Sequence, residues 1–138
     1  MILLDTNVLS EWMKPDPAPA VIGWLDRQNQ SQVFICAVTR AEIETGIALL
    51  PVGTRRAKLR AAANVLLGEL ADRCLPLCCD CAIHYATIIE QSKRLGRPIT
   101  VEDAQIAAIA RQHAATLATR NTRDFDFLEG LSLVNPWA

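Results

Sequence analysis

The sequence lacks an excess of charge of either sign and is poor in aromatic residues. Fourteen lysines and arginines stand against fifteen aspartates and glutamates, a formal net charge of −1. This balance excludes the strongly basic proteins that coat nucleic acid, so any polyanion must be met by local positive charge. Aromatic residues make up only 5% of the chain, which leaves little material for the stacking platforms of a protein that reads single-stranded RNA.

Long apolar runs are also missing. No stretch approaches the roughly 18–20 apolar residues of a membrane-spanning helix. The opening residues MILLDTN lack the basic start of a signal peptide. We therefore expect a cytoplasmic protein without a membrane segment.

Five cysteines, at positions 36, 74, 78, 79 and 81, are an odd number and a poor match to a secreted disulfide framework. The segment CLPLCCDCAIH at 74–84 holds four thiols and His84, which raises the possibility of zinc. Structural zinc sites usually draw ligand pairs from separated segments, and here every candidate lies in one stretch. We favour free thiols packed as small hydrophobic side chains.

What the sequence does contain is enough apolar material for one core. With 138 residues, 51% of them hydrophobic, and no repeat or linker, the chain is expected to form one domain over residues 1–138. Short apolar runs of strand length alternate with longer segments that have apolar residues at helical spacing. This alternation predicts an α/β fold, with helices on both faces of a parallel sheet. The predicted strands are 2–4, 33–36, 75–77, 116–119 and 131–134, and the main predicted helices are 38–50, 55–73, 81–95 and 102–114, with two short helices on either side of a loop at 14–19.

Polar and acidic residues follow several of the predicted strands. Asp5 comes directly after 2–4, Glu42 follows 33–36, and Asn121 and Asp124 follow 116–119. Ligands of open α/β sheets gather beyond the carboxyl ends of the strands. Asp103 begins the helix after a loop at 96–100, and strand geometry alone does not bring it to the same edge.

Helix capping is the alternative interpretation of the same residues. Three pairs fit a capping residue followed three positions later by an acid, and Asp5 or Thr6 could itself cap a helix over 7–13. Periodicity does not decide between caps and a site. A carboxylate at Asp5, however, lies directly behind an apolar strand, where it is costly without a cation or donor. The three pairs are Thr39 with Glu42, Thr100 with Asp103, and Asn121 with Asp124.

The whole chain resembles the PIN-domain family, in particular the VapC-type toxins of bacterial toxin–antitoxin pairs and their FitB-like branch. The resemblance rests on MILLDTNVLSE at 1–11, AVTRAEIETGIALL at 37–50, VEDAQIAAIARQHAATLATRNTRDF at 101–125 and NPW at 135–137. It implies an α/β/α sandwich around a short parallel sheet of about five strands. It also implies a cognate antitoxin, a homodimer, and DNA binding only as a complex with the antitoxin.

By this resemblance Asp5, Glu42 and Asp103 are the metal-binding acids of a ribonuclease. Carboxylates are hard oxygen ligands suited to Mg²⁺, and also to Mn²⁺, which leave open positions for a substrate phosphate. We expect Asp5 and Asp103 to bind the ion directly. Glu42 would bind a second ion or orient the attacking water, since a partly desolvated Glu among other acids has a raised pKa.

The fourth position of the site stays open between two residues. Where some relatives carry an acid after ATR, this chain has Asn121, and Asp124 lies three residues further on. Asn121 ranks slightly ahead because Asp124 also fits the capping pattern. The candidate substrate contacts are Thr6 and Asn7 beside Asp5, and Arg120 and Arg123 on either side of Asn121, although solvated loop arginines would look the same. The few aromatic residues do not cluster near these acids, so no stacking platform for RNA is expected.

The leading hypothesis is a metal-dependent endoribonuclease that acts as the toxin of a toxin–antitoxin module. The alternative is a catalytically weak PIN-like module that acts through antitoxin and DNA binding and transcriptional autoregulation, which the Asn121 departure motivates. A phosphatase with an aspartyl nucleophile is a third possibility. It lacks its general acid because position 7 is Asn.

Overall fold

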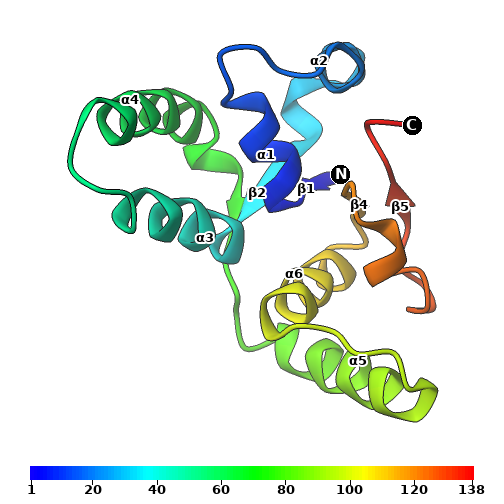
Figure 1. The fold of residues 1–138 in the computed structure, drawn as a ribbon. Coiled ribbons are helices and arrows are strands. Elements are labelled where there is room, and N and C mark those ends of the chain that lie inside the picture. The colour runs from blue at the N-terminus through cyan, green and yellow to red at the C-terminus, as the bar shows by residue number, and fades with distance from the viewer.

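The computed structural model describes all residues, 1–138, and centres on a five-stranded parallel sheet of order β3-β2-β1-β4-β5 (Figure 1). All five predicted strands are present. The third ends before Pro76, which has no N–H to donate to a sheet ladder. The strands are β1 (Ile2–Leu4), β2 (Val33–Cys36), β3 (Cys74–Leu75), β4 (Thr116–Ala118) and β5 (Leu133–Val134).

The helices confirm the predicted alternation, with ends that differ from the predicted ones by a few residues. The two short helices flank the loop at 14–19 as expected. None of the helices combines the length and the apolar character needed to cross a bilayer. The α-helices are α1 (Thr6–Trp12), α2 (Pro19–Asp26), α3 (Ala37–Ala48), α4 (Thr54–Glu69), α5 (Cys81–Leu95) and α6 (Val101–Gln112), and short 3₁₀ turns lie at Gln30–Gln32, Ala71–Arg73 and Thr122–Asp124.

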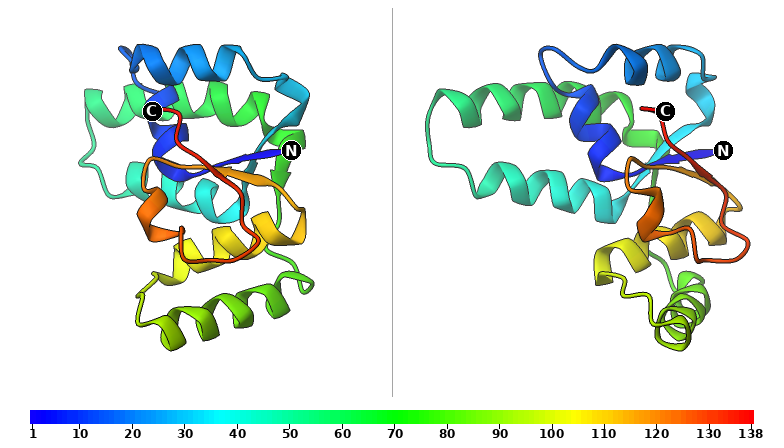
Figure 2. Two further views of the ribbon diagram at one scale, coloured as in Figure 1. Left: turned by 90° about the vertical axis from the view of Figure 1, so that its right-hand side faces the viewer. Right: turned by 45° about the vertical axis from the view of Figure 1, so that its right-hand side comes forward.

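Two apolar clusters, one on each face of the sheet, make the fold an α/β/α sandwich. Side chains alternate along each strand, so Leu3 packs toward α5 and α6 while Leu4 packs toward α1, α2, α3 and α4. In β4 the same alternation sends Leu117 and Ala118 to opposite clusters. Figure 2 shows the two helical layers on either side of the strands. The predicted fold class is confirmed.

Helices α3 and α4 form a two-helix arm, residues 37–69, that extends away from the sheet (Figures 1 and 2). Ile43 and Ile47 of α3 join the apolar cluster that also holds Leu66 and Leu67 of α4. Leu49, at the far end of α3, is 80% exposed. The base of the arm is therefore part of the core, while its tip presents apolar surface to solvent.

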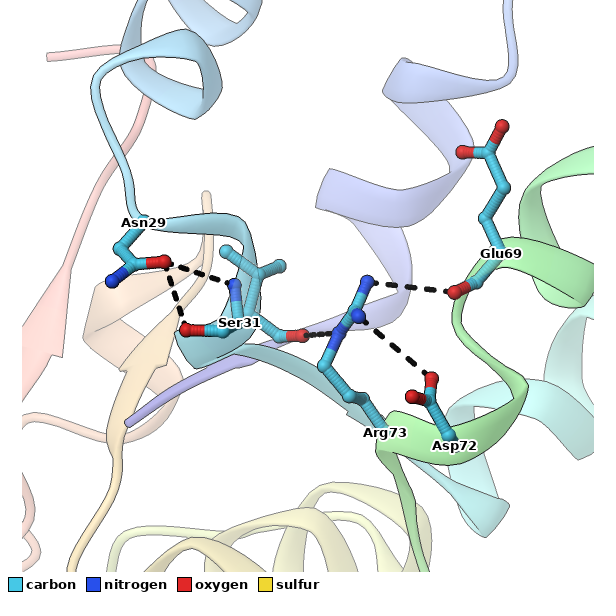
Figure 3. A network of polar contacts seen from close by, with 6 residues as sticks. Asn29, Ser31, Glu69, Asp72 and Arg73 are labelled. Atoms are coloured by element: carbon cyan, nitrogen blue, oxygen red, sulfur yellow. Dashed lines mark hydrogen bonds and ion pairs between the residues drawn. The ribbon is translucent and has the colours of Figure 1, made fainter.

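Arg73 ties the end of the arm to the sheet (Figure 3). Its Nε donates a 3.0 Å hydrogen bond to the carbonyl of Val33 at the start of β2. Its Nη2 donates to the carbonyl of Glu69 at 3.4 Å, and Nη1 lies 3.7 Å from Oδ1 of Asp72. Because β2 continues directly into α3, this anchor helps fix the strand that leads to Glu42.

The cysteines fall into two environments. Cys36 and Cys81 are buried, and burial raises the pKa of both thiols. Cys78 and Cys79 are exposed and Cys74 is intermediate. The interpretation as packed thiols is thus right for Cys36 and Cys81 and wrong for Cys78 and Cys79, which lie in the turn before α5.

This difference predicts a two-phase thiol titration. Under native conditions Cys78 and Cys79 should react rapidly with a thiol reagent, whereas Cys36 and Cys81 should react only on unfolding, because their thiolates are disfavoured by burial. The purified protein should hold less than about one zinc per ten chains. Stoichiometric zinc, together with protection of Cys78 and Cys79, would contradict both statements.

Candidate active site

The candidate site lies between β1 and β4, where the direction in which successive strands are added to the sheet reverses. β1 pairs with β2 on one side and with β4 on the other, and the chain crosses between these pairs only after β3. At such a switch point the loops after neighbouring strands part and leave a crevice. The Asp5 N–H donates to the Ala118 carbonyl at 2.9 Å, which extends the ladder to the edge of this crevice.

Asp5 is a buried carboxylate that accepts three hydrogen bonds. Its side chain receives the Thr6 N–H at 2.8 Å, the Asn7 amide at 3.3 Å and the Thr119 hydroxyl at 2.7 Å. Asp5 also forms the N-cap of α1, so the capping interpretation holds for this residue. Burial raises the pKa of Asp5, and the hydrogen bonds act in the opposite direction. The carboxylate is thereby fixed in place by β1, α1 and β4.

Glu42 comes from the second turn of α3 and reaches the same crevice. The Thr6 hydroxyl donates to Glu42 Oε1 at 2.7 Å. The proposed cap at Thr39 is wrong, because α3 begins directly at the end of β2 and Thr39 is a buried residue inside the helix. Residues of α1 and α3 are thus joined through Thr6.

Asp103 lies in the first turn of α6, and Thr100 caps that helix by accepting the Asp103 N–H at 3.1 Å. α6 leads into the parallel strand β4, so it must begin at the carboxyl edge of the sheet. Burial first, and then the charges of nearby acids, raise the pKa of Asp103 to about 6. Asp103 is therefore both part of a capped helix and a member of an acidic cluster, with Asp5, Asp124 and Glu42 as the acids that raise its pKa.

Asp5, Glu42 and Asp103 line one open pocket of about 430 Å³. Asn121 lines this pocket and Asp124 does not, although the charge of Asp124 contributes to the raised pKa of Asp103. The proposed Asn121 cap is wrong, since its side chain makes no capping hydrogen bond. The other lining residues are Thr6, Asn7, Ser10, Glu11, Lys14, Arg120 and Trp137.

The two candidate arginines differ in their placement. Arg120 lines the pocket, and its backbone N–H donates to the Asn7 side chain at 3.2 Å. Arg123 is not a lining residue, and its carbonyl accepts a 2.7 Å hydrogen bond from Arg97. The structure thus brings Thr6, Asn7 and Arg120 to the acids and leaves Arg123 outside.

The donor set suits a hard divalent cation. Carboxylate and amide oxygens are the ligands that Mg²⁺ prefers, and the pocket offers no thiol or imidazole. As oriented, no three Asp, Glu, His or Cys side chains lie close enough to hold an ion together. Glu42 and Asp103 are only partly buried, so rotation of their side chains can bring the acids closer.

Sequence reasoning missed Glu11, a buried acid in the pocket. Its carboxylate accepts from Lys14 Nζ at 3.2 Å and from the Ala18 N–H at 3.3 Å, which ties α1 to the following loop. The available signal was a polar stripe at helical spacing, formed by Asn7, Ser10 and Glu11 on α1 and by Lys14 just after it.

Trp137 was missed as well: aromatic residues do not cluster at the pocket, but this single indole lies in it. Trp137 is the one hydrophobic lining residue of the pocket, and the Arg120 guanidinium lies 4.9 Å from its ring centroid. Pairing of β5 with β4 brings this C-terminal residue to the site. Its distance from the acids in sequence concealed this.

The raised pKa of Asp103 gives a stability prediction. In the native protein this pKa is about 6, above the usual 3.8. Between these two pH values the native state binds more protons than the unfolded state, so the free energy of unfolding falls as pH rises through this interval. Asp103→Asn should therefore stabilise the metal-free protein at pH 7, by on the order of 1 kcal/mol after solvent screening. The gain should vanish near pH 4, where the wild-type carboxyl is protonated.

Urea unfolding in chelator between pH 4 and pH 7 measures this difference. Glu102→Gln is the matched control, because Glu102 is an exposed acid in the same first turn and does not line the pocket. It should lose a few tenths of a kcal/mol from the helix dipole. An equal loss in Asp103→Asn would show that Asp103 serves only its helix.

Comparisons with known proteins match nearly the whole chain. The family model described as PIN domain matches residues 2–130. A VapC ribonuclease of Sinorhizobium fredii is 41% identical over 141 residues, which cover 99% of this chain and 98% of the relative. Toxin FitB of Neisseria gonorrhoeae is 41% identical over 138 residues, 99% of each chain.

Among solved structures, a FitAB complex bound to a DNA fragment matches with a TM-score of 0.91 and 40% identity, over 100% of this chain and 96% of that chain. The match extends over the sheet, the arm and the C-terminal segment that carries Trp137. On the strength of the family model and of relatives that match along nearly their whole length, the chain belongs to the PIN-domain family.

Proposed function

We propose that this chain is a metal-dependent endoribonuclease and the toxin of a toxin–antitoxin pair. The observation that carries the proposal is the convergence of Asp5, Glu42 and Asp103, from three distant segments, in one open pocket at the switch point of the sheet. Relatives named as a ribonuclease and as a toxin support it.

In this proposal Asp5 and Asp103 hold Mg²⁺ or Mn²⁺. Such an ion polarises the phosphoryl group and lowers the pKa of water. Glu42 orients the water or accepts its proton, and the Thr6 hydroxyl holds Glu42 in position. Asn121 supplies a neutral oxygen at the fourth position, and Asp124 contributes charge from outside the pocket.

The remaining candidates divide into positioning groups and substrate contacts. Thr6 and Asn7 use their side chains within the protein, since Thr6 holds Glu42 and Asn7 bonds both Asp5 and the Arg120 backbone. Arg120, which lines the pocket and is exposed, is the substrate contact that we propose. Arg123 is a weaker candidate because it lies outside the pocket.

The pocket also bears on two alternative functions. The weak PIN-like module is favoured by Asn121, which stands where some relatives have an acid. An aspartyl phosphatase is disfavoured, because the Asn7 amide has no titratable proton to give as a general acid. Its nitrogen and oxygen instead bond Asp5 and the Arg120 backbone.

The proposed partners are a cognate antitoxin and, as a complex with it, DNA. The pocket is open to solvent. Of its acids only Glu11 has an ion-pair partner, Lys14, and the other acids have none. An antitoxin that covers this pocket would block both ion and RNA. The FitAB structure is a complex bound to DNA.

We also propose a homodimer formed through the arm. A hollow of about 690 Å³ on α3 is lined mostly by small and apolar residues, together with Glu42, Glu102 and Gln105, and it shares Glu42 with the acid pocket. Leu49 and Leu77 on this face are 80% and 43% exposed. A second copy seated here would bury this surface next to the site. The small and apolar lining residues are Ala37, Val38, Ala41, Thr45, Gly46, Leu49 and Leu77.

Cleavage of single-stranded RNA tests the leading function. Wild-type protein freed of antitoxin should cut RNA with Mg²⁺ or Mn²⁺, and excess chelator should stop cleavage. Asp5→Asn and Asp103→Asn should each reduce kcat by more than about 100-fold, since even changes to groups behind a metal ligand cost 10–100-fold. Glu90→Gln should cut normally, because Glu90 is exposed on α5 and lines neither the pocket nor the hollow on α3. Wild-type protein that binds the ion and an antitoxin but leaves RNA intact would favour the weak module.

Sedimentation tests the dimer. Leu49→Asp should raise the dissociation constant about tenfold or more, because a charge replaces an apolar side chain that is buried on association. Val65→Asp is the control, since Val65 is 66% exposed on α4 and does not line the hollow. Equal effects of the two variants, or a wild-type monomer, would refute this interface.

A further inference from the structure

Arg120 is an unpaired cation in a pocket rich in acids. It shares the pocket with Asp5, Glu42 and Asp103, yet it forms no ion pair with any acid of the chain. Its guanidinium instead lies over the ring of Trp137, 4.9 Å from the centroid. The indole is thus the group that this cation contacts.

The backbone around both residues is fixed by short-range contacts. The Thr119 N–H donates to the Val134 carbonyl at 2.9 Å, so Arg120 follows directly on the last pairing of β4 with β5. The Asn7 side chain accepts the Arg120 N–H at 3.2 Å. After β5, the Asn135 side chain accepts the Trp137 N–H at 2.9 Å. The C-terminal turn therefore carries the indole to a defined place beside Arg120.

An arginine free to move in this pocket would pair with the acids. Guanidinium and carboxylate form strong bidentate hydrogen bonds, and such a pair would occupy the oxygens that a metal ion needs. Stacking on an indole is an attraction that uses the face of the guanidinium and leaves its N–H groups available. Those N–H groups match the geometry of a phosphate.

We propose that Trp137 is a positioning residue, which holds the Arg120 guanidinium off the acid cluster and presents it to a phosphate of the substrate strand. This rests on the proposed ribonuclease function. Trp137 would then protect metal binding and favour RNA binding through the same contact. Loss of the indole would release Arg120 to compete with the ion.

A double-mutant cycle tests the proposal with two measurements. The variants are Trp137→Leu, Arg120→Gln, the double variant, and Trp137→Phe, which retains an aromatic ring. Mn²⁺ binding without RNA is followed by the electron paramagnetic resonance of the free ion. Cleavage of a short fluorogenic RNA gives kcat and KM at several salt concentrations. Trp24→Leu is the control, because Trp24 packs on the same apolar cluster as Trp137 and does not line the pocket.

Trp137→Leu should weaken Mn²⁺ binding by about two- to fivefold, the size of an exposed cation–π contact, and raise KM by a similar factor with little change in kcat. Trp137→Phe should retain most of the wild-type affinity. In the Arg120→Gln background, Trp137→Leu should change neither quantity. Arg120→Gln should lower the salt dependence of log(kcat/KM) by about 0.7, as the loss of one phosphate contact on a single strand requires. Trp24→Leu should leave both Mn²⁺ affinity and KM unchanged.

Equal effects of Trp137→Leu with and without Arg120 would overturn the proposal and assign Trp137 a packing role. So would unchanged Mn²⁺ affinity and KM in Trp137→Leu. If wild-type protein binds Mn²⁺ but cuts no RNA, the ribonuclease function fails. The Mn²⁺-binding measurements need no RNA and still decide whether Trp137 holds Arg120 away from the acids.

Discussion

The hydrogen bond between the Thr119 hydroxyl and the Asp5 carboxylate, 2.7 Å long and buried, joins the two strands on which the site depends. Thr119 also accepts the Asn121 N–H, so one hydroxyl sets the position of an acid after β1 and of an amide after β4. Asn7 extends the connection from Asp5 to Arg120. Without these donors a carboxylate at the end of an apolar strand would carry a large desolvation cost. The strand order β2-β1-β4 is what makes this arrangement possible.

The same arrangement leaves an electrostatic cost in the folded protein. Burial and neighbouring acids raise the pKa of Asp103, and burial raises the pKa of Asp5 against the opposing effect of its hydrogen bonds. Glu11, which has Lys14 and a backbone N–H as partners, is by contrast satisfied. The pocket therefore contains one acid that stabilises the loop after α1 and others whose charge only an added cation or a partner can compensate. Groups whose placement lowers the stability of the fold are typical of functional sites.

The sequence predicted the layers and the strand-end residues because both follow from local pattern. Asp5 could be placed since side chains after parallel strands meet at one edge. Asp103 could not be placed from strand geometry, although a helix that leads into a parallel strand must start at that edge. The cap at Thr39 failed because α3 follows β2 without a turn. Trp137 was missed because its approach to the acids depends on the pairing of β5 with β4, a contact that periodicity does not encode.

The position of β4 next to β1 has a consequence for the order in which the chain is synthesised. Asp5 is made more than a hundred residues before Thr119, Arg120 and Trp137. On the ribosome β1 emerges while the Asp5 carboxylate still lacks the Thr119 hydroxyl, and the crevice cannot form until β4 has joined the sheet. A nascent chain that stops before β4 consequently cannot assemble the pocket. This topology delays completion of the pocket until β4 and the segment that carries Trp137 have been made.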